Sequence, residues 1–450
     1  MASFNKLFEK LTPQQGIVLY YLVAMFISFL LLRIPWVHKP GVEISYIDSM
    51  FVAVSGISVT GLTPVSIAET YSTFGQMLIL VILNLGGIGV MAMGTLLWVI
   101  LGKKIGMRER QMIMVDNNQN KMSGIVQLIF EIVRTMLVIE ILGALILAFY
   151  FYKDMDSVKM ALYHGLFASV SATTNGGLDI TGESMNVYAD DYFVQTITMA
   201  LIILGAIGFP VIIEIKTYLQ NKLPNFRFSL FAKLTMTTYA LLFIVGTIVI
   251  YLFEYDHAFK NISWHKAIFY AMFQSASTRS AGLTTIDLNS FTEATRFFMS
   301  GLMFIGSSPS SVGGGIRTTT FAILILFLLN YSNGRTTIKV FNKEIDPGDI
   351  QRTFAVIVLA TIICFVALLL ILKFEMGRFG LLSIFFEVMS AFGTCGLSLG
   401  ITGDLTMYSK LVIMALMFIG RVGLISFIIM LGGKAEIDKF RYPKEKIMIG

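Results

Sequence analysis

The stretch Ser58-Val59-Thr60-Gly61-Leu62 is the first of four similar segments, each a run of small and hydroxyl residues that ends in a Gly-Leu pair. The other three pairs are Gly177-Leu178, Gly282-Leu283 and Gly396-Leu397. A second glycine-centred patch follows each pair after 25, 28, 24 and 24 residues, and successive units lie 116, 105 and 114 residues apart. These second patches begin at Gly86, Gly205, Gly306 and Gly420. Nearly all of the 450 residues are therefore four copies of one plan.

The composition is that of a membrane protein. Hydrophobic residues make up 56% of the chain and charged residues only 14%, against roughly 25% charged in soluble domains. At 1.5 Å per residue, four apolar stretches are long enough to cross a hydrocarbon core of about 30 Å. They are Gly16 to Leu32, Ile125 to Tyr150, Leu230 to Phe253 and Phe354 to Leu372. The first lacks a small-residue cleavage pattern and more spans follow it, so it is expected to be a retained helix.

Each long stretch opens one repeat, and a second span is expected to close it. The repeats are predicted at residues 1–122, 123–228, 229–348 and 349–450, the third with an interrupted second helix and the fourth with a cytosolic tail. The fold class is thus an all-α integral membrane protein of four tandem helix–pore-loop–helix repeats. Eight spanning helices and four re-entrant half-helices would surround a pseudo-fourfold central pore.

Lysine and arginine placement predicts the orientation. If every repeat enters and leaves on the same side, that side carries 20 of the 34 basic residues. The positive-inside rule then places both termini in the cytoplasm of a multi-pass protein of the cytoplasmic membrane. The net charge of +6 is explained by topology and by attraction to anionic lipid, so no nucleic-acid partner is expected.

The half-helices are apolar, helix-like and too short to span a bilayer. They are Tyr46 to Ser58, Val158 to Thr173, Trp264 to Thr278 and Phe379 to Phe392. A half-helix that ends at mid-membrane aims the negative end of its dipole at that point, and four such ends favour a cation. Irregular backbone is tolerated there only where it lines a cavity, and its carbonyl groups can replace the hydration shell of an ion.

The four turns after the half-helices are the candidate ion-binding site. Glycine suits them because it accepts backbone angles that turn carbonyls toward an axis and has no side chain to obstruct it. We expect K⁺ to be held by backbone carbonyls alone, at Thr60, Gly61, Gly176, Gly177, Ala281, Gly282, Cys395 and Gly396. The alternative is that these glycines only let helices pack closely. The fourfold recurrence with nearly constant spacing favours the ion site.

The second patches differ from one another. In the first two repeats, small residues let helices approach closely or kink. In the third repeat, proline, serine and glycine cannot sustain a helix between Phe297 and Leu329, which predicts a polar loop at membrane depth. This candidate gate comprises Gly306, Ser307, Ser308, Pro309, Ser310, Ser311, Gly313, Gly314, Gly315 and Arg317. A phosphate-binding loop is disfavoured because no Gly-Lys-Ser/Thr follows.

Four arginines lie at predicted membrane depth, Arg134, Arg279, Arg317 and Arg421. In the fourth repeat Arg421 replaces the small residue seen as Gly87 and Ala206, and a buried charge in a span marks a functional site by default. It is expected to donate to the candidate gate; the alternative is a structural pair with Glu214. Arg279, inside the third turn, would repel cations unless it points backward to another partner.

No other constellation carries chemistry. The four histidines are scattered without metal-ligand spacing, and no nucleophile, base and orienting residue occur in a common motif. An enzyme is therefore not expected, and neither is a covalently bound cofactor.

The pore-loop repeats, the Thr278 to Leu283 stretch Thr-Arg-Ser-Ala-Gly-Leu, the broken third repeat and Arg421 resemble the superfamily of potassium transporters that comprises Ktr, Trk and HKT proteins. The compact N-terminus is similar to that of the Ktr membrane subunit. The resemblance implies potassium uptake, often with sodium as co-ion or activator, by a homodimer with one pore in each subunit. It also implies a cytosolic ring of nucleotide-binding regulatory subunits and an intramembrane gate loop.

Residue by residue, Gly61, Gly177, Gly282 and Gly396 match the family's filter glycines, and Gly306 to Arg317 matches its gate loop. Sodium-selective relatives carry serine at the first filter glycine, so Gly61 favours potassium. The function expected is gated potassium uptake, sodium-stimulated and regulated by the cytosolic subunit. The alternative is a sodium-coupled secondary transporter of another solute, which usually has two repeats and not four.

Overall fold

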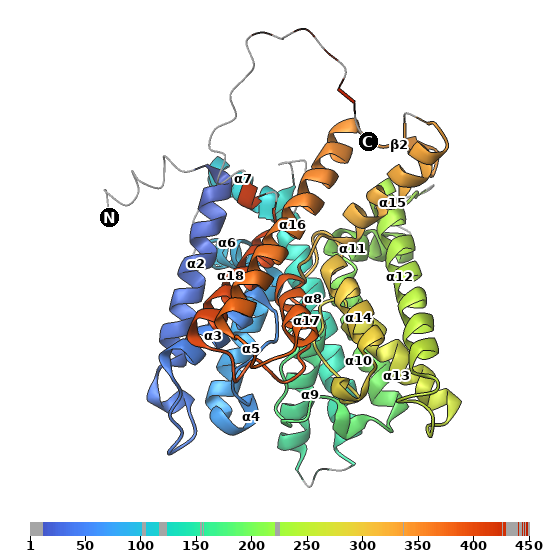
Figure 1. Cartoon of the computed structure of the whole chain (residues 1–450). Helices are drawn as coiled ribbons and strands as arrows, with labels where there is room; N and C mark the ends of the chain where they lie inside the picture. Colours follow the sequence, from blue (N-terminus) through green and yellow to red (C-terminus); the bar gives the residue numbers. More distant parts are fainter. Residues whose placement is uncertain are drawn as a thin grey trace.

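Long helices run side by side around a centre that holds loops in the computed structural model of the chain (Figure 1). The structure describes residues 12–100, 105–116, 124–153, 155, 157–220, 226–335, 337–424, 426–428, 440, 443, 445, 447 and 448. Within these described ranges, four helices are long and apolar enough to cross a membrane. They are α2 (Pro13–Leu32), α8 (Ile125–Phe151), α12 (Leu230–Glu254) and α16 (Pro347–Phe374). All four begin on the same face of the bundle, the upper one in Figure 1, which we call the start face.

The starts of these helices are written in the local sequence. Thr12 forms a capping box with Gln15 before α2, and the side chain of Ser229 accepts from the backbone N–H of Ala232 at the start of α12. Asp346 caps α16, whose first residue is Pro347. Each cap satisfies backbone N–H groups that have no partner within the helix. The outward faces carry exposed apolar side chains such as Phe149 and Phe365, as expected for contact with lipid.

Four short helices follow the long ones and lie inside the bundle. They are α3 (Tyr46–Ser58), α9 (Val158–Thr173), α13 (Trp264–Ser277) and α17 (Leu381–Phe392), here called the pore helices. Their bounds agree with the sequence expectation to within two residues. In the first, Ser45 caps the start, and Val59, with φ of 54°, ends the helix in a left-handed conformation. The pore helices therefore stop where the chain reaches the centre of the bundle.

The second segments of the repeats are broken and not straight. Helix α5 (Thr73–Ile88) meets α6 (Val90–Ile100) at 102°, and α10 (Tyr192–Ala206) meets α11 (Phe209–Leu219) at 106°. In the third repeat, α14 (Glu293–Ile305) and α15 (Thr318–Ser332) are separated by the 306–317 loop; in the fourth, α18 (Met407–Val422) ends at Gly423. The sequence placed an interruption in the third repeat and left either close packing or a kink open in the first two, where the structure has sharp bends.

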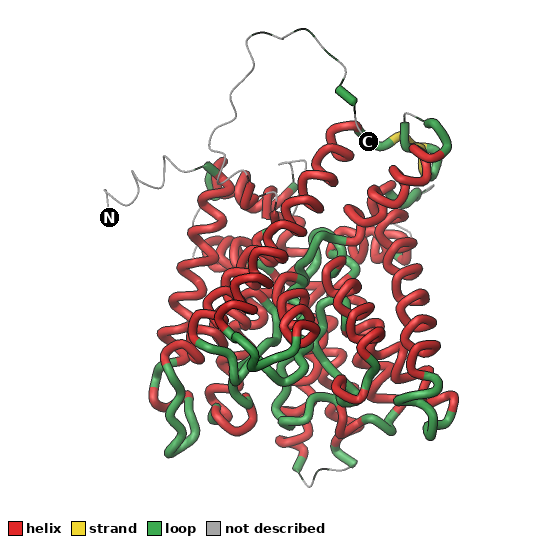
Figure 2. The backbone as a smooth tube through the Cα atoms, in the orientation of Figure 1, coloured by secondary structure: helices red, strands yellow, loops and turns green. Residues whose placement is uncertain are grey.

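The remaining elements are short or lie at the faces of the bundle. They are η1 (Pro35–Val37), α4 (Ile67–Thr70), α7 (Met107–Asp116), η2 (Asn186–Tyr188), η3 (Leu288–Ser290), β1 (Lys339–Val340) and β2 (Lys343–Glu344). The two strands form an antiparallel hairpin in which Lys339 pairs with Glu344. Figure 2 shows loops at the lower and upper edges of the bundle and further loops in its middle, among the helices.

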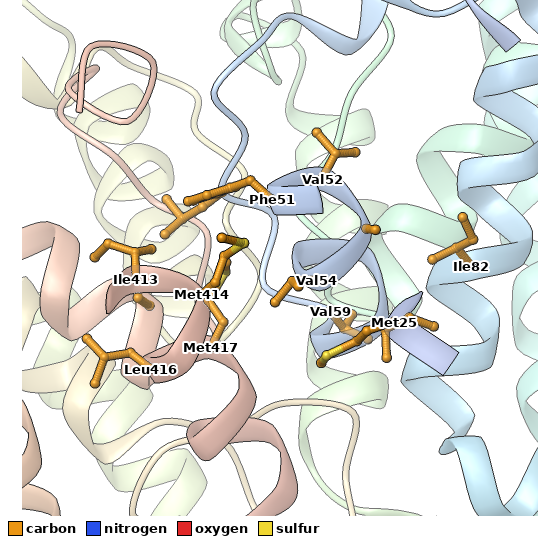
Figure 3. Packing of buried hydrophobic residues seen from close by; sticks show 14 of the residues in the cluster. Met25, Phe51, Val52, Val54, Val59, Ile82, Ile413, Met414, Leu416 and Met417 are labelled. Carbon is orange, nitrogen blue, oxygen red and sulfur yellow. The ribbon is translucent and has the colours of Figure 1, made fainter. Parts of the chain in front are cut away.

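The first and fourth repeats pack against each other, which closes the ring. Figure 3 shows Phe51 and Val54 of α3 beside Ile413, Met414 and Met417 of α18, within the largest hydrophobic cluster of the described residues. On the same seam, the Nζ atom of Lys410 lies 2.8 Å from a carboxylate oxygen of Asp48. The first and fourth repeats are thus joined by packing and by a partly buried ion pair.

The fold is an all-α membrane protein of four helix–pore-loop–helix repeats around a central axis. The outer limits of the expected repeats, residues 1, 122, 123 and 450, lie outside the described residues, and so do some of the basic residues expected on the cytoplasmic side, among them Lys103, Lys121 and Lys434.

Candidate functional site

Four turns lie at the inner ends of the pore helices and form the candidate site. These pore turns are Ser58 to Gly61, Thr174 to Gly177, Arg279 to Gly282 and Gly393 to Gly396. Their non-glycine residues are buried, Thr60, Asn175, Ser280 and Thr394 with no exposed surface. Since each pore helix ends at its turn, the carbonyl ends of four helix dipoles converge on one region.

All four turns use the same unusual backbone. The last glycine of each has a positive φ, 90° for Gly61, 61° for Gly177, 70° for Gly282 and 95° for Gly396. The residue two positions earlier also has a positive φ, although none of the four is glycine. These residues are Val59, Asn175, Ser280 and Thr394. A positive φ raises the conformational energy of Val and Thr. Because the same strain occurs in all four turns, it indicates a functional site.

The four turns form a closed ring. A methyl group placed on Gly61 would lie 2.6 Å from the carbonyl oxygen of Gly176, and one on Gly177 would lie 2.9 Å from that of Ala281. The contact continues round the ring from Gly282 to Cys395 and from Gly396 to Thr60. The eight residues expected from sequence to bind an ion are therefore the eight that meet here. No side chain fits between neighbouring turns, which explains the glycines.

A serine in each pore helix holds each turn, and the sequence interpretation missed these residues. Ser55 and Ser390 accept hydrogen bonds from the N–H groups of Gly61 and Gly396, at 3.0 and 3.1 Å. In the other two repeats the serine instead donates, over 2.5 Å, to the carbonyl of the leucine after the glycine. These pairs are Ser171 with Leu178 and Ser277 with Leu283. A signal was present, because the serine lies five or six residues before every filter glycine.

Arg279 points away from the ring, as expected of a cation within a pore turn. Its Nη2 atom donates to the backbone carbonyl of Tyr239 over 2.7 Å, and its guanidinium carbon lies 4.1 Å from the centroid of the Tyr239 ring. Tyr239 belongs to α12, the outer helix of the same repeat. The partner is thus a carbonyl and an aromatic face, and not a carboxylate.

The second glycine patches form another layer on the start-face side of the pore turns. In three repeats the patch reads Gly-x-x-Gly, beginning at Gly86, Gly205 and Gly420. A methyl group on any of these glycines would overlap a backbone carbonyl near the end of its own pore helix. The last glycine of each patch has φ between 90° and 102° and breaks the second helix. These are Gly89, Gly208 and Gly423.

In the third repeat the 306–317 loop replaces the Gly-x-x-Gly patch and reaches across the axis. The N–H of Ser308 donates to the carbonyl of Ala206 over 3.1 Å, and the N–H of Phe209 donates to that of Ser310 over 2.8 Å. A methyl group on Gly314 would lie 2.7 Å from Oγ1 of Thr394 in the fourth pore turn. The loop therefore lies directly against the ring of turns, tied to the second repeat.

Arg421 ties the loop to the first repeat. The side chain is 7% exposed, and its guanidinium donates to the loop carbonyl of Val312 and to the carbonyls of Gly86 and Gly87, the last at 3.1 Å. The alternative pairing with Glu214 is wrong. That carboxylate accepts from the N–H and the hydroxyl of Ser229, at 2.9 and 2.6 Å. Arg421 therefore bridges the loop and the opposite patch.

Arg317 closes the loop upon itself. Its Nη1 atom donates to the carbonyl of Ser308 over 3.2 Å and to the carbonyl of Gly313. A cavity of about 100 Å³ lies beside the loop, and both Arg317 and Arg421 line it. Among the described residues no group of three or more His, Cys, Asp or Glu could hold a metal ion.

Comparisons with known proteins agree with this geometry. Residues 11–440 match the model of the family TrkH, described as cation transport protein. Over its whole length the chain is 49% identical to the Ktr system potassium uptake protein D of Bacillus subtilis, covering 99% of that protein. It is 32% identical to the potassium/sodium uptake protein NtpJ of Enterococcus hirae, with 98% of both chains covered. The crystal structure of the potassium transporter TrkH from Vibrio parahaemolyticus has the same fold, with a TM-score of 0.75 and 20% sequence identity. The match covers 94% of this chain and 86% of the TrkH chain.

Proposed function

The chain belongs to the TrkH/Ktr family of cation transport proteins, and from that premise we propose that it takes up potassium ions through the ring of pore turns. The family moves cations across a membrane and carries out no covalent chemistry, so the chain is not an enzyme. The printed names of the relatives support potassium as the substrate, one of them together with sodium.

The observation that carries the proposal is the contact between each filter glycine and the carbonyl of the next turn. It runs from Gly61 through Gly177 and Gly282 to Gly396 and back to Thr60. Four backbone carbonyls at equivalent positions around one axis can replace the water molecules around a dehydrated cation. The converging ends of the pore helices add negative potential at the same place. The ion ligands proposed are the eight backbone carbonyls expected from sequence.

The 306–317 loop and Arg421 are proposed to be the gate. The loop lies across the axis on the start-face side of the ring, where an ion leaving the ring must pass it. Hydrogen bonds from a charged donor are worth about 1.5–3 kcal/mol each when buried. The contact of Arg421 with Val312 therefore holds the loop in place, and its loss opens the path.

Orientation and partners complete the proposal. We place the start face in the cytoplasm and the chain in the cytoplasmic membrane, following the lysines and arginines of that face. The word "system" in the name of the Bacillus protein fits a transporter with a second component. A ring of nucleotide-binding subunits is proposed to dock on the basic start face, where Lys216 and Lys233 are described. Homodimer formation and stimulation by sodium are proposed from the same family likeness.

The test is ion flux from purified protein in liposomes. Liposomes that contain the protein are given a potassium gradient and then an equal sodium gradient. The uptake of each ion per folded protein is then compared. Potassium uptake at least tenfold faster than sodium uptake, with no added solute, supports the proposal. Flux of sodium alone that requires an organic solute would overturn it in favour of the secondary transporter. Purification with and without nucleotide tests the partner, which should co-purify in a nucleotide-sensitive manner.

A further inference from the structure

The cavity beside the loop is unusual for a path that cations take. Its lining includes two guanidinium groups, from Arg317 and Arg421, and among its described lining residues there is no aspartate or glutamate. Its volume of about 100 Å³ is several times the ~10–15 Å³ that one water molecule requires. Two positive charges at membrane depth without a carboxylate create a strong positive potential, which attracts an anion and repels a cation.

The donors around this cavity suit an anion. Arg421 is 7% exposed, and its Nε atom has no hydrogen-bond partner among the described residues. Arg317 is the N-cap of α15, a helix of 15 residues, so the positive end of that helix dipole also faces the region. Thr320, a hydroxyl residue, lines the cavity as well, whereas the hydroxyl of Ser311 already donates to the carbonyl of Ser308.

We propose that this cavity binds a small monovalent inorganic anion of the halide type. The outer nitrogens of Arg421 already donate to backbone carbonyls, so the planar two-pronged face that an oxyanion prefers is occupied. What the cavity offers instead is the single Nε–H group of Arg421 and the hydroxyl residue Thr320, beside the positive charge of Arg317, and such separate donors suit a spherical ion. The bound anion lowers the positive potential on the cation path.

The anion also acts on the gate, and this step rests on the proposed function. Val312 holds Arg421 through a neutral carbonyl oxygen that accepts from an outer nitrogen, whereas the anion lies at the unpartnered Nε of the same guanidinium. The negative charge of the anion offsets the positive charge of that guanidinium, so anion binding weakens the contact that holds the loop. By linkage, a ligand that favours the open loop raises cation flux, and the open loop binds that ligand more tightly.

Bromide is the probe for the site itself. Crystals of the full chain in bromide should give an anomalous density peak in the cavity, and Arg317→Gln should abolish it.

Binding in solution is measured in detergent at constant ionic strength, with gluconate as the replacement anion. Arg317→Gln should raise the bromide concentration that gives half of the maximal thermal stabilisation at least tenfold. Thr320→Val, which keeps the side-chain size, should raise it about threefold. Arg352→Gln, an exposed arginine on α16, is the matched control and should leave it unchanged. Absence of a bromide peak in the parent protein would overturn the proposal.

Tracer exchange tests the effect on flux. With equal potassium on both sides no net charge moves, so an anion cannot act merely as counter-ion. Exchange in bromide should exceed exchange in gluconate at least threefold in the parent, and the ratio should fall to one in Arg421→Gln. An anion-independent rate in the parent would overturn the coupling. Bromide density in the parent, together with unchanged flux in Arg421→Gln, would refute the proposed gate and keep the anion site. Raised flux in Arg421→Gln, without bromide density in the parent, would refute the anion site and keep the gate.

Discussion

The ring of pore turns and the layer of second patches are built from the same four repeats, yet only the first keeps the fourfold pattern. Every pore turn has a glycine with positive φ, a second positive φ two residues earlier and a serine from its own pore helix. In the second layer, the third repeat has a 12-residue loop from Gly306 to Arg317 and the fourth has Arg421 where the others have small residues.

The difference follows from what each layer must do. A dehydrated ion needs ligands at similar distances on all sides, so a change in one turn disturbs the whole ring. A barrier needs only one obstacle on the axis, and one loop with one arginine provides it. The second layer is therefore free to differ among repeats, and we expect changes there to alter how much passes but not which ion passes.

The largest effect is expected from a side chain in the ring. Gly396→Ser would place a side chain against the carbonyl of Thr60, displacing an ion ligand. Potassium preference over sodium should fall about 100-fold, equivalent to about 2.7 kcal/mol. Uptake of both ions by liposomes containing the purified variant measures it.

Gly400→Ser is the matched control for that variant. Gly400 has φ of 87°, and a methyl group there would meet no atom within 4 Å. It therefore carries the same backbone strain without the contact, and its ion preference should equal that of the parent. Equal preference in both variants would show that the ring does not select ions.

Removal of the arginine in the second layer should raise the flux and leave the ion preference unchanged. Arg421→Ala removes the hydrogen bonds that hold the loop, so basal potassium flux should rise about 10- to 100-fold at about 1.4 kcal/mol per decade. Shortening the loop between Ser307 and Gly315 should do the same. Potassium uptake per folded protein, with sodium uptake beside it, measures both quantities. Flux at or below the parent level in both variants would show that Arg421 only holds helices together.

A smaller change in preference is expected from the serines behind the ring. Ser390→Ala leaves the N–H of Gly396 buried without its acceptor, at a cost of about 1–3 kcal/mol shared between stability and ion binding. Potassium preference should fall about fivefold, and Ser55→Ala should behave alike because it loses the same kind of bond. Ser332→Ala, an exposed serine at the end of α15, is the control. Unchanged preference in both ring variants would assign these serines to folding alone.

The smallest effect on transport is expected at Glu375, the residue that caps the end of α16 in the fourth repeat. Glu375 accepts from the N–H and hydroxyl of Thr406 at 2.6 and 2.7 Å. Burial by itself raises the pKa of Glu375, but hydrogen bonds from Ser409 and Thr406 outweigh it and hold that pKa below its ordinary value. Because the folded pKa is lowered, the stabilisation is complete above the ordinary pKa of glutamate and is lost as pH falls through the lowered value.

Glu375→Gln should therefore destabilise the protein by about 1.5–3 kcal/mol at pH 7, and the difference from the parent should shrink in acid. Ion preference should not change. Thermal melting in detergent, at pH 7 and at an acidic pH below the lowered pKa of Glu375, measures the loss of stability. The exposed Glu344→Gln is the control. A difference that grows in acid would contradict the direction of the pKa shift.

Much of the plan could be predicted from the sequence because it depends on local chemistry. Apolar length places the long helices, although α2 and α16 begin earlier than the apolar stretches, at the caps Thr12 and Asp346. The short apolar runs before Gly61 and its three counterparts place the pore helices. The repeat of a glycine at near-constant spacing then indicates one architecture used four times. These features lie within a few turns of the chain, where spacing and propensity decide the outcome.

The tertiary structure alone decided which groups meet across the repeats. Arg421 contacts Gly86, 335 residues away in the chain, and Lys410 contacts Asp48, 362 residues away. No local pattern encodes these pairs, because they arise when the fourth repeat packs against the first and a buried charge takes the nearest acceptor. Sequence by itself determined four repeats, a ring of glycine turns and a broken third segment. The partner of Arg279, the contact of Arg421 with the first repeat, the size of the bends at Gly89 and Gly208 and the cavity between the arginines depend on how the four repeats close around the axis.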